Sequence, residues 1–275
     1  MSTAKIKNIV LVVLLFLNVF FLAVAARDIY ENNAARRRTI ENFGVIMQNG
    51  GIELSDGAMP ELTAPKPQKT SRDPYAEATI ARAALGDCEP TDSGGTPSQY
   101  IGERGTATFN ARDEFEIKYT GDYAVAENEA EMLSVAKKLL RRMKIETAEP
   151  EISDNGGDIT VFAAVCRYRK TPTFNCVITF TFDDGRLIGI AGRRPSGVSE
   201  AAGGAERDLP TSMLGFLQFV LDSGAEVTKI TGITAGYRLN VGAFGTGELM
   251  PCWRLDTDAG AFYIDALTGA VEAAA

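Results

Sequence analysis

The sequence contains no histidine in 275 residues. Histidine is the general base of Ser-His-Asp and Cys-His catalytic sites, a common zinc ligand, and the phosphate acceptor of histidine phosphotransfer proteins. All of these chemistries are therefore excluded within this chain. We expect no catalytic residue, no metal site and no cofactor, and we do not expect an enzyme.

Cysteine is also scarce, and the four cysteines are Cys88, Cys166, Cys176 and Cys252. No two of them form a C-x-x-C pair, so the spacing is not that of a zinc site. An even number of cysteines can pair in an oxidising compartment. Cys166 and Cys176 lie symmetrically about Thr171, so a hairpin that turns there would place them opposite each other on adjacent strands. They form the candidate disulfide.

Positive charge is in short supply in the part of the chain expected to fold. Residues 39–275 carry 22 Lys and Arg against 34 Asp and Glu, a net charge of −12. Binding to nucleic acid requires a basic face that contacts phosphates, so we do not expect nucleic acid as a partner. A content of 45% hydrophobic and 23% charged residues is typical of a folded protein, and the length suffices for one or two domains with sizeable cores.

One long hydrophobic run is present, at residues 9–26, after a short tail of residues 1–8. Its 18 uncharged residues would span about 27 Å as a helix, close to the roughly 30 Å of a bilayer's hydrocarbon core. The run therefore predicts a transmembrane helix. Asn18 lies in its middle, where an amide is costly unless it is hydrogen-bonded, and such groups join helices with about 0.6–2 kcal/mol. Asn18 is the candidate partner contact.

The alternative for the same run is a cleaved signal peptide. Lys5 and Lys7 precede it, and Ala23-Val24-Ala25 near its end is an A-x-A cleavage pattern. The 18 residues exceed the roughly 7–15 residues of a usual signal-peptide core, which favours an uncleaved anchor. Both interpretations stay open.

The charges around the run conflict with the orientation that we expect. Two lysines precede it, and four arginines follow it within residues 27–38, so the positive-inside rule taken literally places the folded part inside the cell. Long domains, however, are translocated largely regardless of flanking charge. We expect a single-pass protein of the cell membrane with most of its chain extracytoplasmic.

After the run, hydrophobic periodicity and turn residues predict helices and strands in a repeated order. The helices are expected at residues 75–85, stopped by Gly86, at 128–143, opened by an Asn128-x-x-Glu131 capping box, and from Pro210 to a stop at Gly224. The strands are expected within residues 106–119 and at 159–168, 174–182, 187–191, 228–239, 252–256 and 261–264.

A helix followed by about three antiparallel strands thus occurs twice. The predicted fold class is α+β, an N-terminal transmembrane helix followed by two units in which a helix packs on an antiparallel sheet. The predicted organisation is a tail (1–8), a transmembrane helix (9–26), a helical extension (27–48), a linker rich in Gly and Pro (49–74), a first α+β unit (75–200) and a second α+β unit (201–275).

Three short motifs resemble functional signatures without completing them. The S-x-x-K at residues 134–137 has no accompanying S-D-N or K-T-G element, so a plain amphipathic helix is favoured. The G-x-x-G-x-G at 242–247 lies between strands and is followed by no helix, which favours a loop over a phosphate site. The D-x-D-x-G at 256–260 runs straight into a strand, which favours a hairpin turn over a calcium loop.

Two segments carry a family resemblance. TPTFNCVITFTFDDGRLIGIAGRR and the terminal PCWRLDTDAGAFYIDALTGAV, together with one N-terminal anchor containing Leu17-Asn18, resemble the YycI/YycH-type regulatory proteins of two-component systems. The terminal segment also resembles a PepSY-type hairpin. The most specific matches are Phe174-Asn175, Gly185, Gly192, Trp253 and Asp265-Ala266-x-Thr268-Gly269.

The resemblance implies an extracytoplasmic regulator that modulates a WalK-like sensor histidine kinase through transmembrane and extracytoplasmic contacts, with a paralogous regulator as a further candidate partner. The alternative that the PepSY-like part implies is an inhibitor or chaperone of an exported protease. The matched residues look structural, because Gly185 and Gly269 suit turns with positive φ and Trp253 suits a core strand. No binding residue is therefore carried over from the family.

Overall fold

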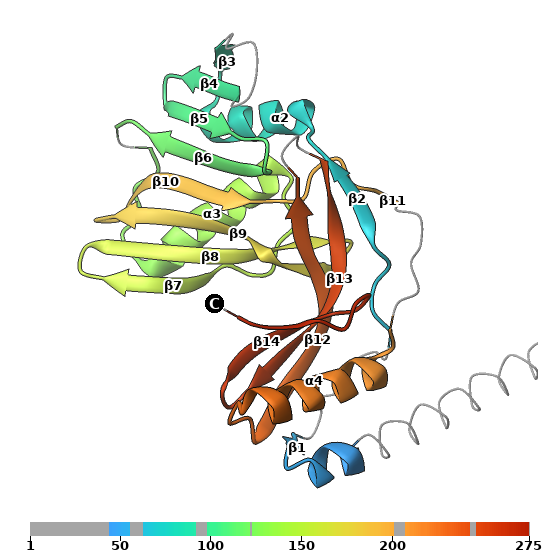
Figure 1. The fold of residues 1–275 in the computed structure, drawn as a ribbon. Helices are drawn as coiled ribbons and strands as arrows, with labels where there is room; N and C mark the ends of the chain where they lie inside the picture. Colours follow the sequence, from blue (N-terminus) through green and yellow to red (C-terminus); the bar gives the residue numbers. More distant parts are fainter. Residues whose placement is uncertain are drawn as a thin grey trace, which may run out of the picture.

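The computed structural model describes residues 44–55, 63–91, 98–121, 123–200, 207–242 and 246–274. The protein is mixed α+β and rich in β-sheet (Figure 1). Residues 44–49 are helical, and the longer helices are α2 (Pro74–Leu85), α3 (Glu129–Met143) and α4 (Leu209–Ser223). Helices therefore form where the sequence predicts them.

Helix boundaries follow from local capping. Each longer helix is preceded by a side chain that accepts the backbone N–H three residues further on, and these N-caps are Asp73, Asn128 and Asp208. Helices α2 and α4 end at Gly86 and Gly224, whose φ angles are 83° and 69°. Glycine suits these ends because positive φ strains residues that carry a Cβ atom.

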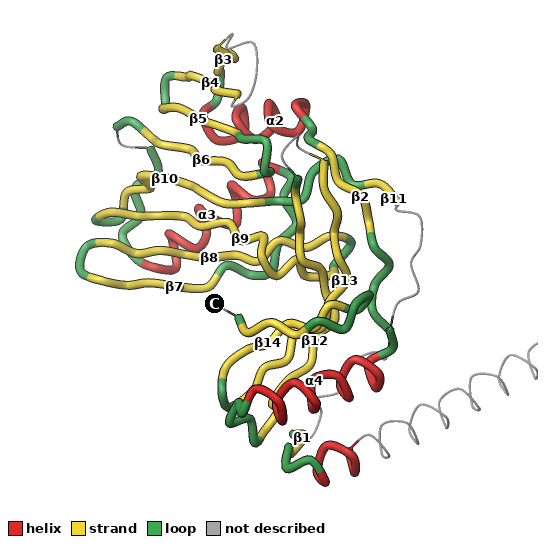
Figure 2. Tube along the Cα trace, viewed as in Figure 1, coloured by secondary structure: helices red, strands yellow, loops and turns green. Residues whose placement is uncertain are grey.

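Eight antiparallel strands form the first sheet, in the order β3-β4-β5-β6-β10-β9-β8-β7. Helices α2 and α3 cover one face of this sheet, and the other face stays open (Figures 1 and 2). The strands are β3 (Cys88–Thr91), β4 (Ser98–Gly102), β5 (Gly105–Phe109), β6 (Glu114–Tyr119), β7 (Glu151–Gly156), β8 (Ile159–Tyr168), β9 (Thr171–Asp183) and β10 (Arg186–Arg193).

The second sheet is built around the long hairpin of β12 and β13. Strand β1 pairs in parallel with β12, while β2 and β14 share the other edge of β13; β11 continues beyond β2 and β15 beyond β14. Helix α4 packs against β14 and β15. The strands are β1 (Glu53–Leu54), β2 (Gln68–Ser71), β11 (Ser199–Glu200), β12 (Lys229–Val241), β13 (Thr246–Thr257), β14 (Gly260–Asp265) and β15 (Val271–Ala273).

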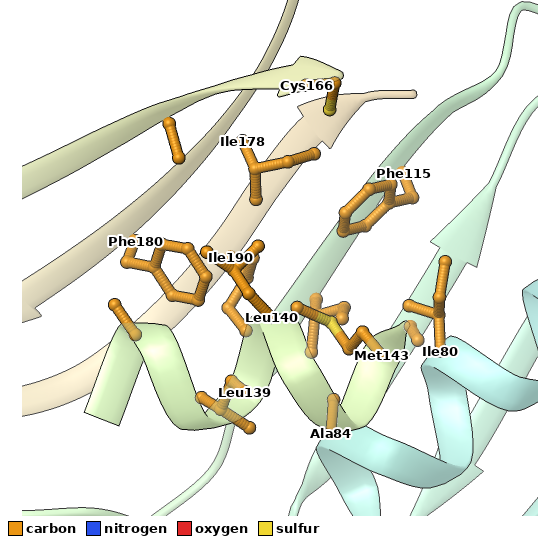
Figure 3. Packing of buried hydrophobic residues seen from close by; sticks show 14 of the residues in the cluster. Ile80, Ala84, Phe115, Leu139, Leu140, Met143, Cys166, Ile178, Phe180 and Ile190 are labelled. Carbon is orange, nitrogen blue, oxygen red and sulfur yellow. The ribbon is translucent and has the colours of Figure 1, made fainter. Parts of the chain in front are cut away.

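Two hydrophobic cores lie between the helices and the sheets. In the first, Ala84 of α2 and Leu140 and Met143 of α3 face Phe115 and Ile178 of the sheet (Figure 3). In the second, α4 covers a set of buried side chains from the hairpins, among them Trp253, Leu255, Phe262 and Ile264. Strand β8 buries every second residue from Thr160 to Cys166, and β9 does so from Cys176 to Phe182, as expected for strands that pack one face on a core. Trp253 is fully buried, as expected.

Strand β9 connects the two sheets. It lies between β8 and β10 in the first sheet, and at Thr173 it pairs in parallel with Tyr237 of β12 in the second. The side-chain amide of Asn175 strengthens the junction: its Nδ2 donates to the carbonyl oxygen of Leu239 at 2.9 Å, and its Oδ1 accepts the N–H of Leu239 at 2.7 Å. The Asn175 side chain thus makes the two hydrogen bonds to Leu239 that the backbone of a neighbouring strand would otherwise make.

The linker predicted at residues 49–74 pairs with the second sheet where the structure describes it. Its described part contains strands β1 and β2, and Gln68 and Thr70 of β2 are buried. Pro65 and Pro67 suggested coil, but proline is tolerated at the start of a strand. Strand β2 pairs with β13, about 180 residues later in the chain, and on its other side with β11, about 130 residues later. Only tertiary structure could reveal that pairing.

Turn positions were partly correct. The hairpin at Asp184-Gly185 turns where predicted, with φ angles of 44° and 75°, and Gly269 also has positive φ, at 78°. The turn expected at Thr171-Pro172 lies instead at Arg169-Lys170, with φ angles of 49° and 69°. A two-residue turn of this kind needs positive φ at both positions, which usually selects Asn and Gly. Arg169 and Lys170 are not typical of such a turn, so the sequence did not indicate it.

Several expectations lie outside the described residues: the transmembrane segment 9–26 with Asn18, and residues 27–43 of the helical extension. Over the ranges that are described, none of the helices has the length and hydrophobicity needed to cross a bilayer. Tyr237, Leu239 and Leu249 of the second predicted unit pack in the core of the first. The two predicted units are therefore in direct contact.

Replacing Asn175 by alanine tests the junction. We expect Asn175→Ala to lower the free energy of unfolding by about 2–4 kcal/mol, because it leaves the N–H and C=O of Leu239 without partners. Asn240→Ala is the matched control, since Asn240 is exposed one residue from Leu239, and a change within about 0.5 kcal/mol is expected there. Chemical unfolding of the detergent-solubilised chain measures both. Equal losses in the two variants would contradict the role of Asn175.

Candidate functional site

The second sheet has one face covered by α4 and one open face. Along β13, Trp253 and Leu255 point into the core beneath α4, so Arg254 between them points to the open face. Tyr263 of β14 is the direct cross-strand partner of Arg254. Alternation therefore places arginine and aromatic side chains together on the open side.

Four side chains on this face stack in a continuous row. The guanidinium carbon of Arg238 lies 5.1 Å from the centre of the Tyr263 ring, and that ring centre lies 5.5 Å from the centre of Phe174. The guanidinium carbon of Arg254 lies 5.9 Å from the Phe174 ring centre. The two separations between an arginine and a ring suit cation–π attraction, which is worth about 0.5–1 kcal/mol each at exposed sites. We call Phe174, Arg238, Arg254 and Tyr263 the ladder.

The ladder depends on a missing side chain at Gly236. A Cβ atom added there would lie 2.5 Å from the Phe174 ring, closer than carbon atoms can approach. Phe174 therefore lies directly over the backbone of β12. Because Gly236 has no side chain, the Phe174 ring can lie against the backbone of β12 and contact the ring of Tyr263 in β14.

Each arginine of the ladder has a carboxylate partner. Nη1 of Arg238 forms an ion pair with Glu272 of β15, and Arg254 pairs with Asp256 two residues further along its own strand at 2.9 Å. Both arginine side chains are 38% exposed. Ion pairs this exposed contribute only about 0–1 kcal/mol. The guanidinium groups are thus oriented by rings and carboxylates yet still in contact with solvent.

A trough of about 300 Å³ lies beside Arg238. Its lining comes from five strands and includes Asn175 of β9, Asn240 of β12, Met250 and Cys252 of β13, and Glu272 of β15. Burial raises the pKa of Cys252 to about 12 and also raises the pKa of Tyr263 above its usual value. Both side chains are therefore neutral at physiological pH, and the charge of the trough comes from Arg238, Asp265 and Glu272.

The candidate disulfide residues lie elsewhere, in the first core. Both are buried thiols, and Cys166 is visible in Figure 3 near Ile178. Val165 of β8 pairs with Val177 of β9, and the register shifts directly after this pair. Cys166 is the next residue of β8 and Cys176 is the preceding residue of β9, and both side chains lie on the core side. The bond stays a prediction. Asn18, the candidate partner contact, lies outside the described residues.

The three weighed motifs occupy structural positions. Ser134 and Lys137 are on α3, where Lys137 forms an ion pair with Glu149. Asp258 lies in the β13–β14 turn, and its carboxylate accepts the N–H groups of Thr228 and Lys229. Of the glycine-rich segment, Gly242 and Gly247 flank the β12–β13 connection, and residues 243–245 are not described.

Sequence reasoning missed Arg238, Arg254 and Tyr263 as a site. One signal was available: charged and apolar residues alternate in CWRLDTD, which indicates a strand with one solvent face. The cross-strand neighbours that turn single arginines into a row were not readable from one strand. Phe174-Asn175 was noted within the family resemblance, and both residues prove important, Phe174 in the ladder and Asn175 at the junction.

Comparison with known proteins gives little further information. No protein-family model and no curated protein matches the chain. An uncharacterised protein from Eubacterium rectale is similar over 82% of this chain and 90% of that chain, with 11% identity and a TM-score of 0.48. The C-terminal domain of YpeB from Bacillus megaterium is similar over 75% of this chain and 99% of that chain, with 12% identity and a TM-score of 0.38. We base no argument on likenesses this distant.

Cysteine reactivity should follow burial. In the folded, reduced protein we expect Cys88 to react first with a thiol reagent, because it is only partly buried while Cys166, Cys176 and Cys252 are buried. Burial raises the pKa of Cys166 and of Cys252 to about 12, so their reactive thiolate is scarce at neutral pH. Mass spectrometry of the alkylated protein measures the order, and denatured protein provides the control in which all four react.

The same mass-spectrometric analysis tests the candidate disulfide. Protein taken from its native compartment under alkylating conditions and mapped without reduction should yield a linked peptide of Cys166 and Cys176. Recovery of both residues as alkylated thiols would refute the pairing.

Proposed function

We propose that the chain is a membrane-anchored regulator that modulates a WalK-like sensor histidine kinase through transmembrane and extracytoplasmic protein contacts. Among the described residues, the observation that carries the proposal is the ladder: arginine and aromatic side chains, half-exposed and already ordered, on a sheet face that no helix covers. Arginine and tyrosine are enriched among the residues that dominate binding energy at protein interfaces.

Rigidity favours the same interpretation. Ladder residues alternate along their strands with fully buried ones such as Trp253, Leu255 and Ile264, so the backbone beneath the ladder is held by a packed core. A preorganised surface loses little conformational entropy on binding. The two sheet units, each a helix with antiparallel strands, would then serve as scaffolds for contact. The proposal includes the prediction that the chain is not an enzyme, which rests on the absence of histidine.

The PepSY-like terminal segment supports an alternative function. It spans the second half of β13, all of β14 and the first residue of β15, and it contributes Arg254 and Tyr263 to the open face. In the alternative, this face contacts an exported protease and inhibits it or assists its folding. The two functions differ in the partner, and both use the same surface.

Cross-linking and co-purification from membranes test the proposal. We expect a sensor histidine kinase, with or without a paralogous regulator, to be recovered with the wild-type chain. Tyr263→Ala should reduce recovery strongly, since interface hot spots contribute about 2 kcal/mol or more. Asn18→Leu should reduce it about 3–30-fold, as expected for loss of about 0.6–2 kcal/mol between helices.

Tyr75→Ala is the matched control, because Tyr75 is a surface tyrosine on α2 with 81% of its area exposed. It should leave recovery unchanged. Recovery of a protease in place of a kinase would favour the alternative function. A kinase recovered equally with all variants would show that neither the ladder nor Asn18 makes the contact.

Topology is tested by labelling a new surface cysteine. Ser134 is exposed on α3, so Ser134→Cys in a Cys88→Ser background leaves one reactive thiol in the folded chain. On intact, reduced cells we expect an impermeant maleimide to label this thiol, because the folded part is proposed to be extracytoplasmic with the anchor uncleaved. The parent Cys88→Ser chain gives the background. Labelling seen only after lysis would place the folded part inside the cell.

A further inference from the structure

Arg238 and Arg254 differ in how their carboxylate partners are held. Asp256 is two residues from Arg254 on β13, in the interior of the second sheet, so the backbones of the two partners are held together by one strand. Glu272, the partner of Arg238, belongs to β15, a strand of three residues that pairs with β14 alone. One arginine therefore has a fixed partner and the other has a partner on a short edge strand.

Glu272 lies where the side chain of a bound peptide would lie. It is the direct cross-strand neighbour of Tyr263, the ring on which Arg238 stacks, and its side chain is 62% exposed. Edge strands with a single neighbouring strand open at lower free-energy cost than inner strands. The ion pair with Arg238 is itself worth only about 0–1 kcal/mol at this exposure. A competing carboxylate could displace Glu272 without disturbing the core.

The trough offers a carboxylate one cationic partner. Among the described residues that line it, Arg238 is the only lysine or arginine. Oδ1 of Asp265 is already engaged, because it accepts the N–H groups of Leu267 at 2.8 Å and Thr268 at 2.7 Å. The amide groups of Asn175 and Asn240 lie in the same lining, although the amide of Asn175 already bonds Leu239. Arginine stacked on a ring is preorganised for a two-point bond to a carboxylate.

We propose that the trough binds an extended segment of the partner protein through an Asp or Glu side chain that replaces Glu272 on Arg238. Glu272 is then an intramolecular competitor that occupies the arginine until the partner arrives. The proposal rests on the proposed function, since it assigns the chemistry of the contact made by the ladder. The group that Arg238 holds in this structure identifies the occupant: it is a carboxylate, that of Glu272, and Arg238 is the one cation among the described residues that line the trough.

The experiment selects peptides against the full chain in detergent micelles, using a library of random dodecapeptides displayed on phage. The enriched peptides are synthesised with a fluorophore, and their affinities are measured by fluorescence anisotropy. We expect an Asp or Glu at one constant position. Replacing it by Asn or Gln should weaken binding about tenfold or more, as for a hydrogen bond to a charged group.

Variants of the chain assign the contact. Arg238→Gln should weaken the acidic peptides about tenfold or more, and the combined change in chain and peptide should cost no more than either alone, because both remove one interaction. Glu272→Gln should strengthen binding by about 2–5-fold, since it removes the competitor. Arg142→Gln is the matched control, because Arg142 is an exposed arginine on α3, outside the ladder and the trough lining, and it should change affinity less than twofold. Thermal unfolding of each variant confirms that it is folded.

Contrary results separate the two proposals. Peptides that depend on Tyr263 but carry no acidic position, or that bind Arg238→Gln as well as wild type, would overturn the carboxylate site and leave the ladder as a protein-binding surface. A basic position whose binding is lost in Glu272→Gln would also overturn it, in favour of a cationic segment. Failure to enrich any peptide whose binding depends on Tyr263 or Arg238 would count against both the inference and the proposed function.

Discussion

Strand β9 belongs to two sheets, and the amide of Asn175 holds it in both. In the described part of β12, one parallel bridge from Tyr237 to Thr173 is the pairing with the first sheet. The side chain of Asn175 therefore makes the hydrogen bonds to Leu239 that a neighbouring strand would otherwise make. Buried or half-buried backbone groups are rarely left unpaired. The relative placement of the two sheets depends on these two hydrogen bonds between Asn175 and Leu239.

The open trough is a consequence of that junction. Because β9 meets β12 at one point, Phe174 lies over Gly236 while Asn175 lies at the side of the trough, and β15 with Glu272 lies at the opposite edge. A more extensive pairing of β9 with β12 would have continued the sheet flat past this point. The ladder residue contributed by the first sheet, Phe174, is therefore adjacent in sequence to the residue that joins the sheets.

Elements were predictable where local signals decide them. The Asn128 cap, Pro210 in the first turn of α4, and Gly86 and Gly224 at helix ends all act within a few residues. Strand β2 was not predictable, because Pro65 and Pro67 just before it argue for coil and its partner β13 is remote in sequence. The turn at Arg169-Lys170 was missed for another reason: the surrounding hairpin imposes positive φ on residues that do not favour it.

The site was less predictable than the fold, because no single residue in it is unusual. Arg238, Tyr263 and Arg254 come from three strands, and each reads in sequence as an ordinary exposed position. What makes them a site is register, which pairs Arg254 with Tyr263 and Tyr263 with Glu272 across the sheet. A shift of one residue in any of these pairings would send one member into the core beneath α4. The buried residues between them, Trp253 and Ile264, prevent that shift, so the core on one face determines the arrangement of charge on the other.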